Sequence, residues 1–133
     1  MASPTCVEIK HEWDIVHARQ QGRQLAKELG FGYVDQARIT TAISELARNI
    51  YLYAGKGRVW IEAIELDGKV GLRIKAEDQG PGIEDISKAM EDGYTTSGGL
   101  GAGLPGVKRL MDEFDLLSTV GEGTVITAMK FLR

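Results

Sequence analysis

Three groups of residues in this chain have types and spacings that could act on a phosphate-bearing ligand. Two of them are rich in glycine, namely Asp78-Gln-Gly-Pro-Gly82 and the run from Gly98 to Gly106. The third is the pair Glu45 and Asn49, which lie four residues apart. We therefore predict that the stretch 78–107 forms a ligand site, with the polar segment between its glycine groups as a flap.

The second glycine run, Gly101-Ala-Gly-Leu-Pro-Gly106, matches the dinucleotide-binding fingerprint letter by letter. That fingerprint follows a buried strand directly, whereas the polar residues Tyr94 to Ser97 precede this run, so a dinucleotide site is disfavoured. No Gly-Lys-Ser/Thr motif and no His-Arg-Asp catalytic loop accompanies it. Glycines still let backbone N–H groups approach phosphates, and a helix predicted from Leu104 would present its N-terminus to them. A glycine-rich surface loop without a ligand explains the run equally well.

The side chains that could act beside such a loop come from two other places. Asp78 ends a predicted strand, and its carboxylate could accept a hydrogen bond from an exocyclic amine such as that of adenine. A turn-forming aspartate before glycine is the commoner alternative. Glu45 and Asn49 share one face of a predicted helix. Asn49 could give an oxygen to Mg²⁺ and Glu45 could accept a proton or orient a water, although a plain polar helix face also fits this pair.

The elements that must position these residues follow from periodicity. Residues 69–77 alternate apolar and polar side chains on either side, which indicates a sheet with one buried and one wet face. All helices should therefore cover the same face. We predict an α/β (α+β) two-layer sandwich with a mixed, largely antiparallel sheet. The expected strands cover 5–10, the two sides of Asp67-Gly68, 114–120 and 124–132, and the expected helices cover 14–29, 35–54, 83–90 and 104–113.

Composition restricts the class of protein. The 133 residues, 43% of them hydrophobic, suit one domain over 1–133 with a single core. A net charge of -3 gives no general attraction to nucleic acid or to an anionic membrane. Cys6 is the only cysteine, which excludes an intrachain disulfide and a metal site built from cysteines. Without a signal peptide or an apolar run of membrane-spanning length, we expect a cytoplasmic protein.

The order of the motifs is more specific than any one of them. Glu45-Leu-Ala-Arg-Asn49, then Asp78-Gln-Gly80-Pro-Gly82, then Gly99-Leu-Gly101-Ala-Gly103-Leu104 resembles the GHKL family of ATPases and kinases. This family includes gyrase, the Hsp90 chaperones, histidine kinases and anti-sigma-factor kinases, and its nucleotide-binding domain has the Bergerat fold. Residues 41–50 and 98–107 are similar to the switch serine/threonine kinases of bacterial stressosomes. The resemblance covers nearly the whole chain.

This resemblance implies an ATP- and Mg²⁺-dependent serine/threonine protein kinase. Glu45 would be the general base or position a water, and Asn49 would bind Mg²⁺. Asp78 would hold the adenine amino group, and Thr124 would assist through a water. The ATP-binding residues that it implies are Asn49, Asp78, Gly80, Gly82, Gly99, Gly101, Gly103, Leu104 and Thr124.

The resemblance also implies partners. The substrates would be STAS-domain proteins of the RsbS and RsbR types, and phosphorylation would free the kinase to bind an RsbU-like phosphatase or another downstream regulator. No histidine-bearing dimerisation helix precedes the domain, so a complete sensor histidine kinase is not expected. Two other functions remain open: a nucleotide-gated module that sequesters a partner with little or no catalysis, and a stand-alone ATPase.

One feature departs from some anti-sigma kinases. No lysine or arginine lies between Lys88 and Lys108, so the predicted flap carries no cation for the γ-phosphate. Phosphoryl transfer requires positive charge at the transferring group. Lys108, Arg109 or a cation of the partner are the candidates to supply it.

Overall fold

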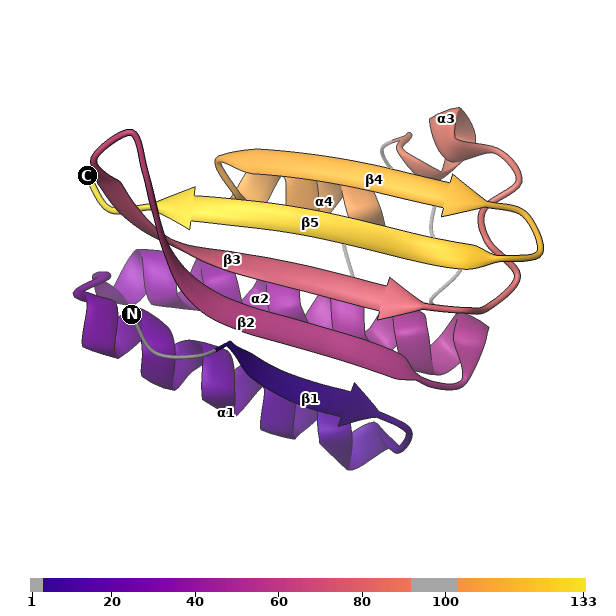
Figure 1. Cartoon of the computed structure of the whole chain (residues 1–133), viewed down its shortest axis with the longest axis horizontal. Helices are drawn as coiled ribbons and strands as arrows, with labels where there is room; N and C mark the ends of the chain where they lie inside the picture. Colours follow the sequence, from indigo (N-terminus) through magenta and orange to yellow (C-terminus); the bar gives the residue numbers. More distant parts are fainter. Residues whose placement is uncertain (1–3, 92–102) are drawn as a thin grey trace.

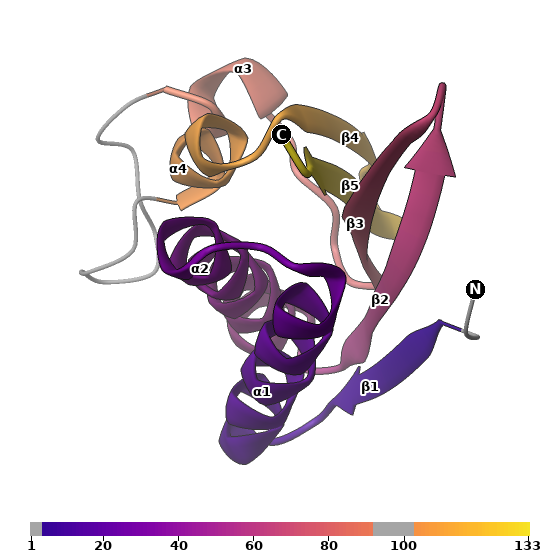
Figure 2. The same cartoon turned by 90° about the vertical axis from the view of Figure 1, so that its left-hand side faces the viewer.

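Figure 1 shows the chain as a computed structural model, which describes residues 4–91 and 103–133. The edge-on view in Figure 2 separates two layers, with helices on one side and a sheet on the other. The elements in chain order are β1 (Thr5–Ile9), α1 (Glu12–Leu29), α2 (Tyr33–Asn49), the π-helix η1 (Ile50–Ala54), β2 (Gly57–Leu66), β3 (Lys69–Asp78), α3 (Ile86–Ala89), α4 (Gly103–Leu110), β4 (Glu113–Thr119) and β5 (Gly123–Phe131).

The described strands form a five-stranded sheet in the order β1-β2-β3-β5-β4, and every neighbouring pair is antiparallel. The predicted two-layer α+β sandwich is confirmed, and its sheet is antiparallel throughout the described residues rather than mixed. Asp67 and Gly68 form the predicted hairpin turn, with φ angles of 51° and 78°. A two-residue hairpin of this kind needs positive φ at both positions, which aspartate tolerates and glycine adopts freely.

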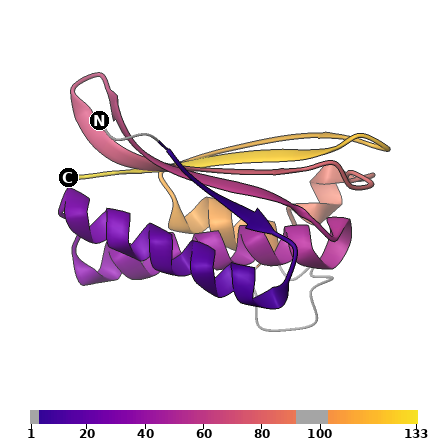
Figure 3. The same cartoon turned by 60° about the horizontal axis from the view of Figure 1, so that its bottom comes forward.

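The alternation along β3 correctly predicts which face of the sheet is covered. Leu72, Ile74 and Ala76 are buried, and α1, α2 and α4 all lie on their side of the sheet (Figure 3). Ile43 and Leu46 of α2 are among the side chains that meet them in one hydrophobic core. The core therefore lies between the layers, and α2 crosses beneath the sheet towards the end of β3.

Three of the predicted helices differ from the structure by more than a small shift of the first residue. The helix predicted for 35–54 is α2 followed by η1, where the N–H of Gly55 donates to the carbonyl of Ile50, five residues back. The helix predicted for 83–90 is confined to α3. The helix predicted for 104–113 ends at Leu110, because the N–H of Asp112 already donates to Met129 of β5 and pulls the chain into the sheet.

The described residues do not include Gly99 and Gly101. Of the predicted flap, segment 91–97, they include only the first residue. The helices within 4–91 and 103–133 include none with the length and apolar character needed to span a bilayer.

Candidate functional site

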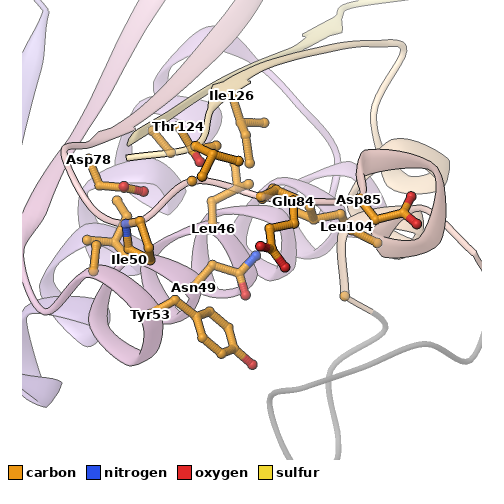
Figure 4. A pocket seen from close by; sticks show the side chains of 18 of the residues that line it. Leu46, Asn49, Ile50, Tyr53, Asp78, Glu84, Asp85, Leu104, Thr124 and Ile126 are labelled. Carbon is orange, nitrogen blue, oxygen red and sulfur yellow. The ribbon is translucent and has the colours of Figure 1, made fainter. Parts of the chain in front are cut away.

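A cavity of about 700 Å³ lies between the C-terminal end of α2, the ends of β3 and β5, and the loop that leads to α3 (Figure 4). Its volume falls in the range of sites for small molecules and cofactors. The predicted site residues that line it come from five separate segments of the chain. They are Asn49, Asp78, Gly82, Gly103, Leu104 and Thr124.

The transition from α-helix to π-helix shapes one wall of this cavity. Asn49 is the last residue of α2, and the next turn is η1, whose residues Ile50, Tyr53 and Ala54 also line the cavity. A π-turn inserts one extra residue and so changes the direction of the side chains that follow it. The side chain of Asn49 points into the cavity, which Glu84 also lines (Figure 4).

Asp78 closes the opposite end of the cavity. Its Oδ1 accepts a hydrogen bond of 2.9 Å from the N–H of Gly80. Partial burial raises the pKa of this carboxyl above its ordinary value, although the backbone N–H groups of Gly80 and Thr124 act to lower it. The ionised form is an acceptor held by backbone donors at the base of a mostly apolar cavity, which suits recognition of an N–H group on a ligand.

Three glycines allow the backbone to close tightly around Asp78. A Cβ on Gly80 would lie 2.7 Å from the Cβ of Ala54, so Gly80 lets the loop approach η1. Gly82 has a φ of 78°, and a Cβ there would lie 2.5 Å from the carbonyl oxygen of Thr119. Gly80 itself does not line the cavity, so its part in the predicted site is to support Asp78.

Gly123 is the most constrained of these positions. Its φ is 127°, and a Cβ would lie 2.1 Å from the carbonyl oxygen of Asp78. We expect Gly123→Ala to lower the free energy of unfolding by about 2–4 kcal/mol, through backbone strain and displacement of Asp78. Urea denaturation followed by circular dichroism measures the change.

Gly121 in the same turn is the matched control. Its φ of 84° is also positive, but a Cβ there would meet open space. Gly121→Ala should therefore cost only the conformational penalty, about 1 kcal/mol. Equal losses for the two variants would show that the contact between Gly123 and Asp78 is unimportant.

Glu45 is not among the residues that line the cavity. It lies on α2 one turn before Asn49, is 6% exposed, and forms an ion pair of 3.5 Å with Arg48. Its side chain shares the helix face of Asn49 at i and i+4, as predicted. Its assignment as general base stays a prediction.

The structure adds lining residues that the sequence patterns did not single out. Tyr53 from η1, Glu84 and Asp85 from the loop after β3, and Lys88 from α3 all border the cavity. By contrast, Lys108 is exposed in the last turn of α4 and does not line it. The first four follow the recognised motifs by only a few residues, but no periodicity in the sequence marks them as converging.

The donor set in the cavity fits a Mg²⁺ ion that arrives with a nucleotide. The described residues contain no group of three or more histidine, cysteine or acidic side chains that could hold a metal by themselves. Mg²⁺ commonly takes one or two protein oxygens and completes its shell with phosphates and water. The amide oxygen of Asn49 and the carboxylate of Glu84, both of which line the cavity, are of this kind.

An antiparallel sheet covered on one face by helices, with a cavity between the last turn of its central helix and the loop after β3, defines a Bergerat-type ATP-binding domain. The chain belongs to the family of histidine kinase-, DNA gyrase B- and HSP90-like ATPases, whose model matches residues 34–132. The predicted membership of the GHKL family is confirmed.

Two relatives of the chain are a bacterial protein kinase and a bacterial anti-sigma factor. It is 73% identical over 133 residues to the serine/threonine-protein kinase RsbT of Bacillus subtilis, with 100% of each chain covered. It is also 38% identical over 102 residues to the anti-sigma F factor of Caldanaerobacter subterraneus, covering 72% of this chain and 70% of that one.

Two solved structures share the fold. One contains the RsbU and RsbW domains of a Mycobacterium tuberculosis protein, at a TM-score of 0.68 and 20% identity, covering 99% of this chain and 33% of that one. The other is the catalytic domain of the histidine kinase ThkA, at a TM-score of 0.55 and 16% identity, covering 96% and 95%. These likenesses support the fold class.

Proposed function

We propose that this chain binds ATP with Mg²⁺ in the cavity beside Asn49 and transfers the γ-phosphoryl group to a serine or threonine hydroxyl of a partner protein. The enzyme is a serine/threonine protein kinase of the partner-switching kind, which the full-length identity of 73% to RsbT and the similarity to anti-sigma F factors support. The observation that carries the proposal is that Asn49, Asp78 and Thr124 border one cavity.

At the inner end of the cavity, Asp78 and Thr124 would hold the adenine. Asp78 lies opposite Thr124 in the pairing of β3 with β5, so the two side chains are neighbours by register. The carboxylate accepts the N6 amino proton, and the Thr124 hydroxyl completes the edge directly or through a water. Apolar side chains such as Leu46, Ile50 and Ile126 would contact the ring.

At the outer end, the phosphates would lie between Asn49 and the N-terminus of α4. The N-terminus of α4, at Gly103 and Leu104, would offer them backbone N–H groups and a positive dipole end. Asn49, together with Glu84 from the same cavity, would hold Mg²⁺, which neutralises phosphate charge when bound. Gly99 and Gly101, outside the described residues, belong to the same proposed phosphate loop.

No lysine or arginine lies between Lys88 and Lys108. Lys88 is the cation best placed to supply positive charge near the γ-phosphate. It lines the cavity from α3, whereas Lys108 and Arg109 lie on the exposed side of α4. Its ammonium group would offset developing charge on the transferring phosphoryl group. Glu45 would accept the proton of the attacking hydroxyl.

The phosphoryl acceptors in this proposal are STAS-domain proteins of the RsbS and RsbR types. Phosphorylation would release the kinase to bind an RsbU-like phosphatase or another downstream regulator, and the switch would operate in the cytoplasm, where ATP is available. The support is the relationship to RsbT over the whole chain. If the chain only sequesters its partner, its affinity for the partner should depend on ATP and no phosphorylated product should form. If it is a stand-alone ATPase, it should release ADP at the same rate with and without the partner.

Radiolabelled phosphate transfer from Mg-ATP to a STAS-domain partner tests the kinase proposal, with Asp78→Asn as the first variant. We expect Asp78→Asn to weaken ATP binding by about ten- to a hundredfold, since it removes a charged acceptor of a hydrogen bond. Asn49→Ala should reduce transfer through loss of Mg²⁺ binding. Transfer by the wild type no greater than by both variants would refute the proposal.

The pKa of Asp78 gives the same variant a second, opposite effect. Because burial raises this pKa in the folded state, ionised Asp78 opposes folding at neutral pH. Asp78 contributes fully to the free energy of unfolding only when the pH is below the ordinary pKa of 3.8. This contribution is lost as the pH rises through the raised pKa of the folded state. Asp78→Asn should therefore raise the unfolding temperature of the nucleotide-free protein at pH 7, and the difference should shrink in acid.

A further inference from the structure

We infer that Arg48 makes a protein hydroxyl, rather than water, the acceptor of the phosphoryl group, because it holds the carboxylate of Glu45 turned away from the cavity until a partner binds. Arg48 is in this sense a specificity-determining residue that acts through Glu45. The inference rests on the proposed function, in which Glu45 accepts the proton of the attacking group.

The order of side chains around α2 places Glu45 between Arg48 and the cavity. An α-helix turns by about 100° for each residue, so Asn49 lies about 40° to one side of Glu45 and Arg48 about 60° to the other. Asn49 lines the cavity, whereas Glu45 and Arg48 do not. A carboxylate of Glu45 that turns towards Arg48 therefore turns away from the proposed Mg²⁺ ligand.

The ion pair shows which way the carboxylate of Glu45 is turned. Its Oε1 lies 3.5 Å from Nη1 of Arg48, and the side chain is only 9% exposed. Among the described residues, this carboxylate has no other ion pair and no side-chain hydrogen bond. A buried charge is unfavourable without a counter-charge, so Glu45 stays with Arg48 as long as nothing else draws the guanidinium away.

A base that is held away from the cavity suppresses hydrolysis of bound ATP. In hydrolysis, a water oxygen bonds to the γ-phosphorus, the bond from this phosphorus to the β,γ-bridging oxygen breaks, and one proton of the water passes to Glu45. The products are ADP and inorganic phosphate. Because water is always present, a base that permanently faced the cavity would consume ATP before any partner arrived.

The exposed part of Arg48 gives a partner the means to release Glu45. Arg48 directly precedes Asn49 on α2, and 39% of its side chain is exposed. An acidic side chain of a docked partner can therefore pair with the guanidinium, which binds carboxylates through two parallel hydrogen bonds. Glu45 is then free to turn towards the cavity and accept the proton of the hydroxyl that the same partner presents.

Hydrolysis of Mg-ATP in the absence of a partner, followed as phosphate release, tests the inference. Arg48→Met removes the charge and keeps the aliphatic stem. We expect it to raise the rate about three- to tenfold, because the ion pair no longer lowers the fraction of Glu45 that faces the cavity. Arg48→Lys keeps a cation and should hydrolyse ATP as slowly as the wild type. A wild-type rate in Arg48→Met would overturn the inference.

A double variant shows whether the effect passes through Glu45. Glu45→Gln/Arg48→Met should hydrolyse ATP no faster than Glu45→Gln, since Arg48 acts only through this carboxylate. Calorimetry should find ADP affinity in Arg48→Met within about twofold of the wild type, because the change concerns the chemical step. A double variant that keeps the faster rate would contradict the inference, since a site opened to water would then explain it.

Arg38→Met is the matched control. Arg38 also pairs with an acid three residues before it on α2, with 2.9 Å between its Nη1 and Oδ1 of Asp35. This pair lies near the opposite end of the helix from Asn49. Arg38→Met should therefore hydrolyse ATP at the wild-type rate. An increase equal to that of Arg48→Met would show that the position of Arg48 beside Glu45 is unimportant.

The inference and the proposed function fail in different experiments. If Glu45→Gln transfers phosphate to a STAS-domain partner as fast as the wild type, Glu45 is not the proton acceptor and the proposed mechanism is wrong. If Glu45→Gln loses transfer but Arg48→Met hydrolyses ATP at the wild-type rate, the inference alone is wrong. Should Arg48→Met not fold, Arg48→Gln makes the same test, with faster hydrolysis expected and an unchanged rate against the inference.

Discussion

Replacing Glu45 with glutamine is expected to lower kcat for phosphoryl transfer by a factor of about 10² to 10⁴ and to leave ADP affinity within about twofold. Glutamine has nearly the same size and can still form hydrogen bonds, but it cannot accept the proton of an attacking hydroxyl. Glu45 is 6% exposed on α2, one turn before Asn49, so it shares a helix face with the proposed Mg²⁺ ligand. The reduction should therefore fall on the chemical step rather than on binding.

Single-turnover transfer to a phosphoacceptor partner measures this effect, and calorimetry with ADP measures binding. Glu28→Gln is the matched control, because it makes the same change on α1, where Glu28 pairs only with Gln24 in the hydrogen bonds that the described residues show. Glu28→Gln should transfer phosphate at the wild-type rate. If Glu45→Gln keeps its kcat, Glu45 is not the proton acceptor. If ADP affinity falls in parallel with kcat, its role is in binding.

The largest expected change in stability comes from a buried lysine. Lys130 of β5 is 5% exposed, and its Nζ donates to the carbonyl of Leu110 at 2.9 Å and lies 3.6 Å from Asp112 and 3.8 Å from Asp35. Lys130→Met should lower the free energy of unfolding by about 3–5 kcal/mol, because both carboxylates lose a buried counter-charge and the carbonyl loses its donor. Urea denaturation measures the loss.

The pH dependence of this loss follows from Asp112. Burial acts to raise its pKa, but the N–H of Phe131 and the charges of Lys130 and Arg133 outweigh burial and hold the pKa below the ordinary 3.8. Because the pKa of Asp112 is lowered in the folded state, ionised Asp112 stabilises the fold when the pH is above its ordinary pKa. This stabilisation is lost as the pH falls through the lowered pKa. The difference between wild type and Lys130→Met should thus be greatest near neutrality and narrow in strong acid.

Lys75→Met is the control for that experiment. Lys75 lies on the wet face of β3, where its side chain is 46% exposed and pairs with Glu77 at 3.8 Å. A surface pair of this kind contributes little, so the variant should stay within about 0.5 kcal/mol of the wild type. A loss as small as this for Lys130→Met would show that the buried cluster does not stabilise the fold.

Local patterns predicted much of the fold. The alternation in 69–77 correctly identified the buried face of β3, and Asp67-Gly68 correctly identified the hairpin, because each depends only on residues within a few positions. The predicted ends of helices were less accurate where contacts with residues far along the chain determine where the helix stops. The helix predicted to reach 113 stops at Leu110, since Asp112 is already bonded to Met129 of a strand that comes later in the chain.

By itself, the sequence determined the family, because three short motifs in a fixed order carry that information, and it predicted the candidate nucleotide-binding residues. The tertiary structure alone decided which other side chains join them. Lys88 and Glu84 border the cavity, Ser118 contacts both Ile83 and Thr124, and the Lys130 cluster reaches back to Asp35. These contacts depend on β5 lying between β3 and β4 and on the path of α2 beneath the sheet. No local pattern encodes them, because chain packing, not spacing along the sequence, brings these residues together.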